Sequence, residues 1–226
     1  GALVAELVAG SIGHRLGLPV PDLAVIEMSE GFGRAEPDPE IRELLGRSTG
    51  ANAGLRFLRG ALPYRAGVSA WPSAELAADV VWFDALVTNI DRTARNPNVL
   101  LCAGDPWLID HGAALYIQNT WRDPDAHARR PFVQAADHLL LGVAGSIEAA
   151  DARLAGRLDR DVLEAILLEV PDAWLSVPHE RLVDYLVRRL EPPRPFVAGA
   201  EGARQALLQG GPQRVGRARG EARTDA

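Results

Sequence analysis

Two short polar segments carry residue types that could do chemistry. The first, "NIDRTARNPNVLL" at 89–101, contains Asp91 and Asn96, and the second, "IDHGAAL" at 109–115, contains Asp110. Each segment borders a run of aliphatic residues. Carboxylate and amide oxygens suit a hard cation such as Mg²⁺, which takes few protein ligands and completes its shell with phosphate and water. The chemistry that these residues indicate is phosphoryl transfer.

The surrounding pattern predicts how the two segments are brought together. Residues 73–89 have a Ser N-cap candidate with Glu75 nearby and apolar residues on nearly all faces, which predicts a buried helix. Two strands are expected next, at 98–102 and 106–111, joined by the turn composition "AGDP". The loop with Asp91 precedes the first strand and Asp110 ends the second, so both acids should lie at the same end of one hairpin.

The rest of the chain predicts a mixed α and β start followed by helices. A first helix is expected over 2–16, ended by Gly17, because apolar residues recur there at helical spacing. We expect strands at 22–28 and 54–64, with a Gly/Pro-rich loop at 29–40 and a short helix at 41–48 between them. Three further helical segments are predicted at 138–156, 159–175 and 178–190, and the segment 198–226 has little to bury and is expected to be weakly ordered.

Composition limits the class of protein. The 226 residues are 47% hydrophobic, which is enough to bury a sizeable core. The formal charge of −6 argues against nucleic acid or an anionic membrane as a partner. No apolar run reaches the roughly 20 residues needed to span a bilayer, and the start lacks the features of a signal peptide, so we expect a cytoplasmic protein. The single Cys102 cannot form an internal disulfide and is expected in the core.

Two features of the sequence bear on mechanism. All of the Lys+Arg total is arginine, so no mechanism that needs a lysine can use this chain alone. The chain starts without Met and inside a helical pattern, and we therefore expect its N-terminus to be a truncation.

Other polar residues indicate less specific roles. The histidines at 14, 127, 138 and 179 show no pair at the i, i+4 spacing of helical metal ligands, so we expect no zinc site. The pair Arg129-Arg130 lies in an expected loop, where it either touches substrate or is merely exposed.

The polar segments resemble a known family. Asp91-Arg92 with Asn96, followed by a hairpin and Ile109-Asp110-His111-Gly112, resembles the catalytic loop and metal-binding motif of protein-kinase-like enzymes. The resemblance is closest to HipA-like kinases, including small bacterial members, and to the lipid-kinase-like branch, where an Asp-Arg pair replaces the usual Arg-Asp order. It runs from residue 1 to about residue 195 and departs from standard kinases at His111, where Phe is usual.

This resemblance implies an α+β, protein-kinase-like fold of two lobes. The expected domains are a truncated small lobe at 1–68, a mostly helical large lobe at 69–197 with the catalytic loop and metal-binding hairpin, and the tail at 198–226. ATP and Mg²⁺ are the implied cofactors and would lie between the lobes. In the family pattern, Asp91 would orient the nucleophile, while Asn96 and Asp110 would hold Mg²⁺.

The resemblance also assigns residues of the small lobe. Glu6 stands where kinases place the helix Glu that holds a phosphate-anchoring lysine, and that lysine and the glycine-rich loop are expected in a segment before residue 1. The backbone groups of Leu58, Arg59 and Gly60 are candidates for the hinge that carries the adenine edge.

Several assignments have an alternative. Asn98 could replace Asn96 as ligand, although the five-residue offset favours Asn96 and Asn98 then caps the turn into the strand. Arg92 either pairs with a carboxylate in its loop or faces solvent. His111 could be a third metal ligand, but we favour a structural role for it. Glu6 is either the family residue or a solvated helix residue.

The function expected from the resemblance is ATP- and Mg-dependent transfer of a phosphoryl group to a hydroxyl. Ser or Thr of a protein is a candidate acceptor. The alternative is a non-catalytic pseudokinase or interaction module that keeps the fold. No nucleic acid or membrane partner is expected, and the sequence does not label the acceptor.

Overall fold

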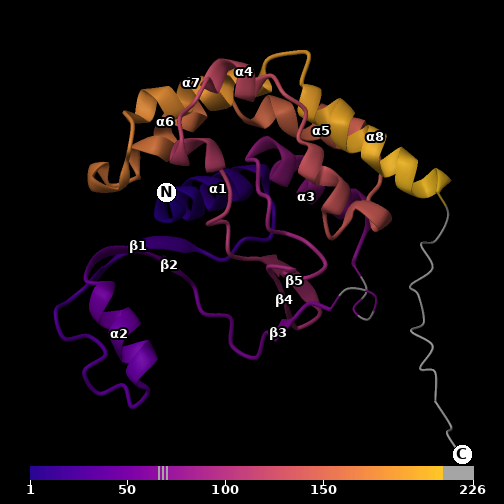
Figure 1. Cartoon of the computed structure of the whole chain (residues 1–226). Coiled ribbons are helices and arrows are strands. Elements are labelled where there is room, and N and C mark those ends of the chain that lie inside the picture. The colour runs from indigo at the N-terminus through magenta and orange to yellow at the C-terminus, as the bar shows by residue number, and fades with distance from the viewer. Residues whose placement is uncertain (66, 68, 70, 211–226) are drawn as a thin grey trace, which may run out of the picture.

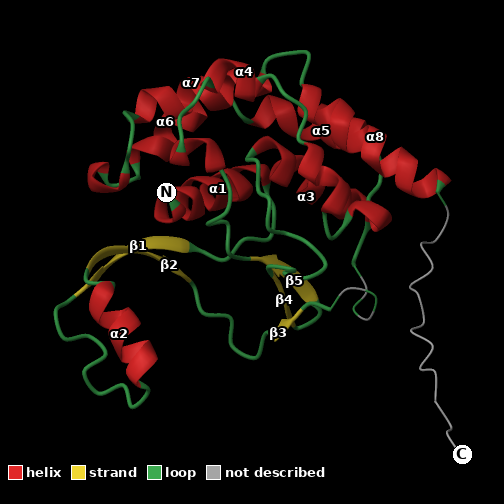
Figure 2. Ribbon diagram, viewed as in Figure 1, coloured by secondary structure: helices red, strands yellow, loops and turns green. Residues whose placement is uncertain are grey.

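The computed structural model describes residues 1–65, 67, 69 and 71–210, and these residues form a mixed α+β fold (Figures 1 and 2). The first half alternates helices and short strands, whereas the second half is helical. In chain order the elements are α1 Ala2–Leu16, β1 Leu23–Met28, α2 Pro39–Arg47, β2 Gly50–Leu55, β3 Leu62–Pro63, α3 Ala74–Leu86, β4 Val99–Cys102, β5 Asp105–Leu108, α4 Pro124–Ala128, α5 Ile147–Leu154, α6 Arg160–Leu168, α7 His179–Leu190 and α8 Pro195–Gln209. No helix in the described part of the chain is both long and apolar enough to cross a bilayer.

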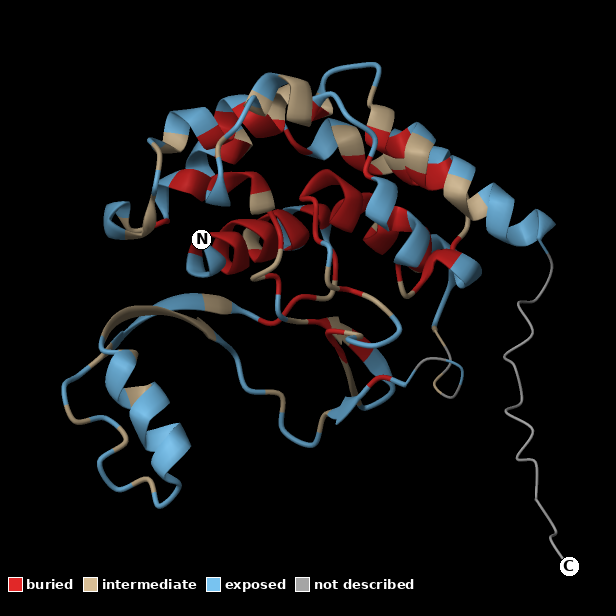
Figure 3. Ribbon diagram, viewed as in Figure 1, coloured by how far each residue is buried: buried red, intermediate tan, exposed pale blue. Residues whose placement is uncertain are grey.

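Helices α1 and α3 form the centre of the core. Both lie between the outer helices and the two small sheets, and both are buried over most of their length (Figure 3). Trp82 and Phe83 of α3 are completely buried, and the Trp82 ring packs edge-on against Phe196 of α8 with 5.7 Å between ring centroids. A helix with apolar residues on nearly all faces is stable only when neighbours cover it, as they do for α3 beyond its first turn.

The strands form two separate antiparallel sheets. Strands β1 and β2 pair along their whole length, from Leu23 opposite Leu55 to Met28 opposite Gly50. The second sheet has the order β3-β4-β5. The turn between β4 and β5 consists of Ala103 and Gly104, which have φ values of 54° and 95°, as a two-residue hairpin turn requires at both positions.

The predicted end of α1, the predicted cap of α3 and the predicted hairpin are confirmed. Gly17 ends α1 in the left-handed conformation, with φ 77°, and the Ser73 side chain accepts a hydrogen bond from the Leu76 N–H at the start of α3. Short strands occupy 99–102 and 105–108, close to the predicted positions. The second strand ends at Leu108 rather than at 111, so Asp110 lies just beyond the hairpin instead of in its last pair.

The prediction of one strand at 54–64 was wrong, because a turn interrupts the middle of this range. Strand β2 occupies 50–55 and β3 only 62–63, and the residues between them form a turn in which Ala61 N–H donates to the Leu58 carbonyl. Gly60 has φ 75° in this turn, which ends an extended strand.

Two of the later helices are shorter than predicted. The helix expected from 138 begins only at Ile147, after Ser146 caps it by accepting from the Ala149 N–H, because Gly142 and Gly145 interrupt the earlier residues. Helix α6 ends at Leu168, shortly before Pro171, rather than running to 175.

The weakly ordered tail predicted from residue 198 was wrong for 198–209. These residues belong to α8, where Ala200 and Glu201 are buried. Small residues let α8 approach its neighbours closely, and a Cβ atom added at Gly199 would lie 3.0 Å from Pro131 Cβ. Residues 211–226 and residue 68, which was to end the small lobe, lie outside the described residues.

Candidate active site

A buried ion pair anchors the loop between α3 and β4. Asp84, near the end of α3, and Arg92 both have fully buried side chains, and Asp84 Oδ2 accepts a 2.6 Å hydrogen bond from Arg92 Nε. Asp84 Oδ1 also accepts from the Asn89 amide at 3.0 Å. The turn that leads to Asp91 is therefore tied to the helix before it.

His138 completes this cluster from a distant segment. Its Nδ1 accepts a hydrogen bond from the Leu140 N–H at 3.1 Å, so Nε2 carries the proton that is donated to Asp84 Oδ2 at 2.9 Å. Burial by itself would raise the pKa of Asp84, but the charge of Arg92 and the hydrogen bonds from His138 and Arg92 outweigh burial and hold this pKa well below its usual range. Asp84 is thus a buried carboxylate that accepts hydrogen bonds from three side chains, those of Asn89, Arg92 and His138.

Arg92 extends the cluster to both ends of the hairpin. Its Nη1 donates to the backbone carbonyls of Asn98, before β4, and of Ile109, after β5. The two alternatives for Arg92, pairing with a carboxylate of its own loop or facing solvent, were both wrong, because its partner is Asp84 of α3. The reason is that the loop folds back over the end of α3, which places the guanidinium in the core.

Asp91 is held by amide groups. Its Oδ2 accepts from the Asn96 amide at 2.6 Å and from the Asn98 amide at 3.3 Å, and its own N–H donates to Asn89 Oδ1 at 3.1 Å. Asp91 is half-buried and Asn96 is exposed. The Asp91 carboxylate is therefore fixed in place while it keeps contact with solvent.

Asn98 joins the Asp91 loop to the segment of Asp110. Its amide nitrogen lies 3.3 Å from Asp91 Oδ2 and 3.4 Å from the backbone carbonyl of Asp110. Asn98 is buried, and both Asn98, with φ 49°, and the exposed Asp110, with φ 53°, have a left-handed backbone. Asn tolerates this conformation better than most residues. Because its amide is engaged in this way, Asn98 acts as a brace, which leaves Asn96 as the better candidate ligand.

The segment after Asp110 is bound to α1. Glu6 Oε2 accepts a 2.6 Å hydrogen bond from the His111 N–H, and Glu6 Oε1 lies 3.4 Å from His111 Nδ1. The His111 ring is completely buried, edge-on to Phe83, which supports the structural role for His111. Glu6 is buried as well, so the alternative of a solvated helix residue was wrong.

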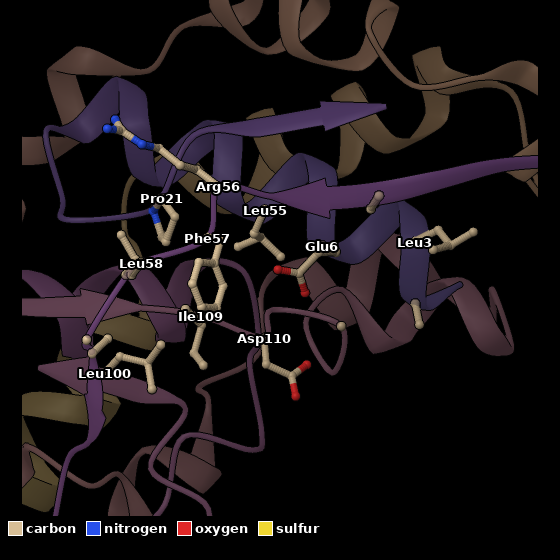
Figure 4. Close-up of a pocket in the computed structure, with 15 residues that line it drawn as sticks. Leu3, Glu6, Pro21, Leu55, Arg56, Phe57, Leu58, Leu100, Ile109 and Asp110 are labelled. Atoms are coloured by element: carbon tan, nitrogen blue, oxygen red, sulfur yellow. The ribbon is translucent and has the colours of Figure 1, made fainter. Parts of the chain in front are cut away.

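A cavity of about 580 Å³ opens beside these residues (Figure 4). Figure 4 shows the side chains of Glu6 and Asp110 on one side of it and apolar side chains, among them Phe57 and Leu100, on another. An apolar cleft with a few polar groups at one end is the usual form of a small-molecule site.

The structure brings together some predicted site residues and not others. Glu6, Leu58, Gly60 and Asp110 all line the cavity. Arg59 is not among its lining residues, and its carbonyl lies 3.7 Å from Cys102 Sγ instead. Cys102 is half-buried rather than in the core. Asp91 and Asn96 lie outside the lining but are joined to the Asp110 backbone through Asn98.

The donor set around Asp110 fits a magnesium ion better than a transition metal. Asp110 is exposed and lines the cavity, and the amide oxygen of Asn96 accepts no hydrogen bond within the described ranges. No cluster of three or more His, Cys, Asp or Glu residues that could hold a metal exists in the described part of the chain. Mg²⁺ needs only one or two protein carboxylates, because water and phosphate supply its other ligands.

Asp84, Asn89 and His138 were not identified as site residues from the sequence. One signal was present, because Asp84 is an acid within the apolar run that ends α3, and a buried acid requires a partner. His138 could not have been found in this way, since it lies far along the chain from Asp84.

The comparisons with known proteins agree with the motif. A family model described as HipA-like kinase matches residues 1–190. No curated protein and no solved structure matches the chain. The family match covers the loop with Asp91, the hairpin and the Asp110 segment, and the chain belongs to the HipA-like kinase family.

Proposed function

We propose that this protein transfers the γ-phosphoryl group of ATP to a hydroxyl group in a reaction that depends on Mg²⁺. Family membership implies kinase activity and the use of a nucleotide. The observation that carries the finer proposal is the position of Asn98, whose single amide nitrogen contacts both the Asp91 carboxylate and the Asp110 backbone at the edge of the cavity.

Asp91 is the proposed catalytic residue. Its carboxylate is fixed by two amide donors, so it can accept a hydrogen bond from an acceptor hydroxyl and take up the proton as that oxygen bonds to phosphorus and ADP leaves. Among the described residues Asp91 forms no ion pair, and its neighbour Arg92 is fully engaged with Asp84 and with backbone carbonyls.

Asp110 and Asn96 are the proposed ligands of Mg²⁺. When bound there, the ion would neutralise charge on the phosphates and orient them. The left-handed backbone at Asp110 is held by Asn98 from one side, and the neighbouring His111 N–H is held by Glu6 from the other, so the position of the Asp110 carboxylate depends on both contacts.

The adenine ring would occupy the apolar part of the cavity. Leu58 and Gly60, in the turn between β2 and β3, face it together with Leu100. In this proposal the turn is the hinge of a two-lobed kinase, with the small lobe before it and the helical lobe after it. The proposed hinge contacts are backbone groups of Leu58 and Gly60.

One observation favours a second candidate, a pseudokinase or interaction module. Both carboxylate oxygens of Glu6 are directed at His111, and the sequence contains no lysine that Glu6 could hold. Without that lysine the phosphates of the nucleotide lack their usual anchor, and Arg56, which lines the cavity, is paired with Asp22 at 3.2 Å. The first candidate therefore predicts slow turnover by this chain, and the second predicts none.

A calorimetric titration tests the proposal. ATP should bind in the presence of Mg²⁺ and much more weakly with EDTA. In a turnover assay, the purified 226-residue chain should convert ATP to ADP slowly. Ala61→Trp, which places a large ring in the cavity, should abolish binding, whereas Ala136→Trp at an exposed position outside the cavity should not. Binding that is equally strong with EDTA, or that survives Ala61→Trp, would show that the cavity is not a Mg·ATP site.

A further inference from the structure

A second cavity, of about 300 Å³, lies in the helical half of the protein. It is lined by Thr88, which follows α3, by Tyr116 and the segment 130–134, which come after the metal-binding motif, by His127 of α4 and by Arg189 of α7. Of the residues proposed to bind Mg·ATP, Leu58, Gly60 and Asp110 line the other cavity, and neither these nor Asn96 line this one.

This cavity has two arginines and no acid in its lining. Arg189 is almost completely buried, and Arg130 is exposed at the surface. Neither forms an ion pair with any acid in the described part of the chain. A buried guanidinium without a carboxylate partner is unusual, because its desolvation is normally compensated by an opposite charge.

Backbone carbonyls orient Arg189. Its Nε donates to the Leu86 carbonyl at 2.8 Å and its Nη2 to the Ala85 carbonyl at 2.6 Å, both at the end of α3. Nη1 lies 3.3 Å from the Ala128 carbonyl. These contacts hold the guanidinium in a fixed position, but they supply only partial negative charge.

His127 adds neutral hydrogen-bonding groups. Its ring nitrogens lie 2.9 Å from the Tyr185 hydroxyl and 3.0 Å from the Tyr116 hydroxyl. Burial lowers the pKa of His127, and the nearby charges of Arg189 and Arg130 lower it further. A neutral imidazole donates through one nitrogen and accepts through the other, so one tyrosine accepts from the ring and has its own O–H free to donate elsewhere.

Thr88 is a buried donor without a partner. Its side-chain oxygen makes no hydrogen bond within the described residues, although only 1% of the residue is exposed. Burial raises the pKa of Tyr185, and the nearby Thr88 hydroxyl opposes part of this rise. No hydrogen bond of good geometry joins the two hydroxyl groups. A buried hydroxyl that faces a polar cavity without a partner indicates a ligand that would supply one.

From this arrangement we propose that the second cavity is a binding site for a small oxyanion, a phosphate or a carboxylate group. Arg130 and Arg189 provide the positive charge, and the Thr88 hydroxyl provides a neutral donor. The tautomer in which His127 Nε2 donates to Tyr116 leaves the Tyr116 O–H free as a second neutral donor. The site assigns a role to one member of the Arg129-Arg130 pair, since Arg130 lines the cavity whereas Arg129 pairs with Glu191 at 3.4 Å. The proposal does not depend on the proposed kinase reaction, and only the Mg·ADP competition described below rests on the proposed nucleotide site.

Calorimetric titrations of the 226-residue chain with inorganic phosphate and, separately, with succinate test the proposal and distinguish a phosphoryl group from a carboxylate. Arg130→Gln should weaken binding of the preferred anion at least about tenfold, the loss expected for one charge-assisted hydrogen bond. Arg129→Gln is the matched control, because it removes the same charge from the neighbouring position outside the cavity, and it should change affinity less than about twofold.

Two further measurements keep the result specific to this cavity. Tyr116→Phe removes one hydroxyl and should also weaken anion binding, and saturating Mg·ADP should leave anion binding unchanged because the nucleotide is assigned to the other cavity. The proposal is overturned if neither anion binds, if Arg129→Gln and Arg130→Gln weaken binding equally, or if Mg·ADP displaces the anion. In those cases Arg189 serves only to cap the end of α3.

Discussion

The carboxylate of Asp84 and the guanidinium of Arg92 form a completely buried ion pair, with 2.6 Å between Asp84 Oδ2 and Arg92 Nε. One residue belongs to a core helix and the other follows the proposed catalytic Asp91 directly. The pair therefore connects the stability of the core to the geometry of the site.

Asp84→Asn should destabilise the protein strongly. Removing one charge from a buried pair leaves the other uncompensated, which typically costs about 3–5 kcal/mol of unfolding free energy. Urea denaturation would measure the loss. Asp184→Asn is the control, since Asp184 pairs with Arg160 at 2.6 Å on the surface and its replacement should have little effect. Equal losses in the two variants would contradict the role given to Asp84.

Asn98 offers a separate test of the brace between Asp91 and Asp110. Asn98→Gly and Asn98→Ala both remove the amide, so both should weaken Mg·ADP binding to a similar extent. Only alanine is strained at φ 49°, and Asn98→Ala should be less stable than Asn98→Gly by about 1 kcal/mol. Thermal unfolding and calorimetry would measure the two effects. Unchanged nucleotide affinity in both variants would show that Asn98 does not position the metal ligands.

The protein should lose stability through His127 as the pH falls below about 6.5. Burial and the two arginines lower its folded pKa, so its contribution to stability is present above the unfolded pKa near 6.5 and is lost as the pH falls toward the folded pKa. His127→Gln should show a smaller loss over this range than the wild type. His179→Gln, at a partly exposed position, is the control for removing one histidine. A wild-type loss that persists in full in His127→Gln would contradict the assignment.

Much of the fold could be predicted because its signals are local. Ser73 and the apolar run after it marked the start of α3, and Gly17 marked the end of α1. The prediction failed where tertiary contacts decide. Helix α8 looked too poor in large apolar residues to be ordered, but it is buried through small residues and through Glu201, which accepts from the Ile147 N–H at 2.8 Å.

The residues of the candidate site also differ in whether local sequence or tertiary contacts reveal them. The types and spacing of Asp91, Asn96 and Asp110 could be recognised in the sequence, because the loop and hairpin that carry them are continuous. The buried partners could not, since Asp84 meets His138 across 54 positions of sequence. The pairing of Glu6 with the His111 backbone joins positions still farther apart, and only the folded structure shows it.

The central claim, that Asp91 acts in chemistry and Asp110 holds the metal, is tested most directly by measuring Mg·ATP affinity and turnover for Asp91→Asn and Asp110→Asn side by side. We predict that Asp91→Asn binds Mg·ATP within a few-fold of the wild type but loses about 10²–10⁴ in rate, as expected for loss of a general base. Asp110→Asn should lose nucleotide affinity and its dependence on Mg²⁺. If Asp91→Asn instead abolished Mg·ATP binding while Asp110→Asn preserved it, the assignment of this site would be wrong.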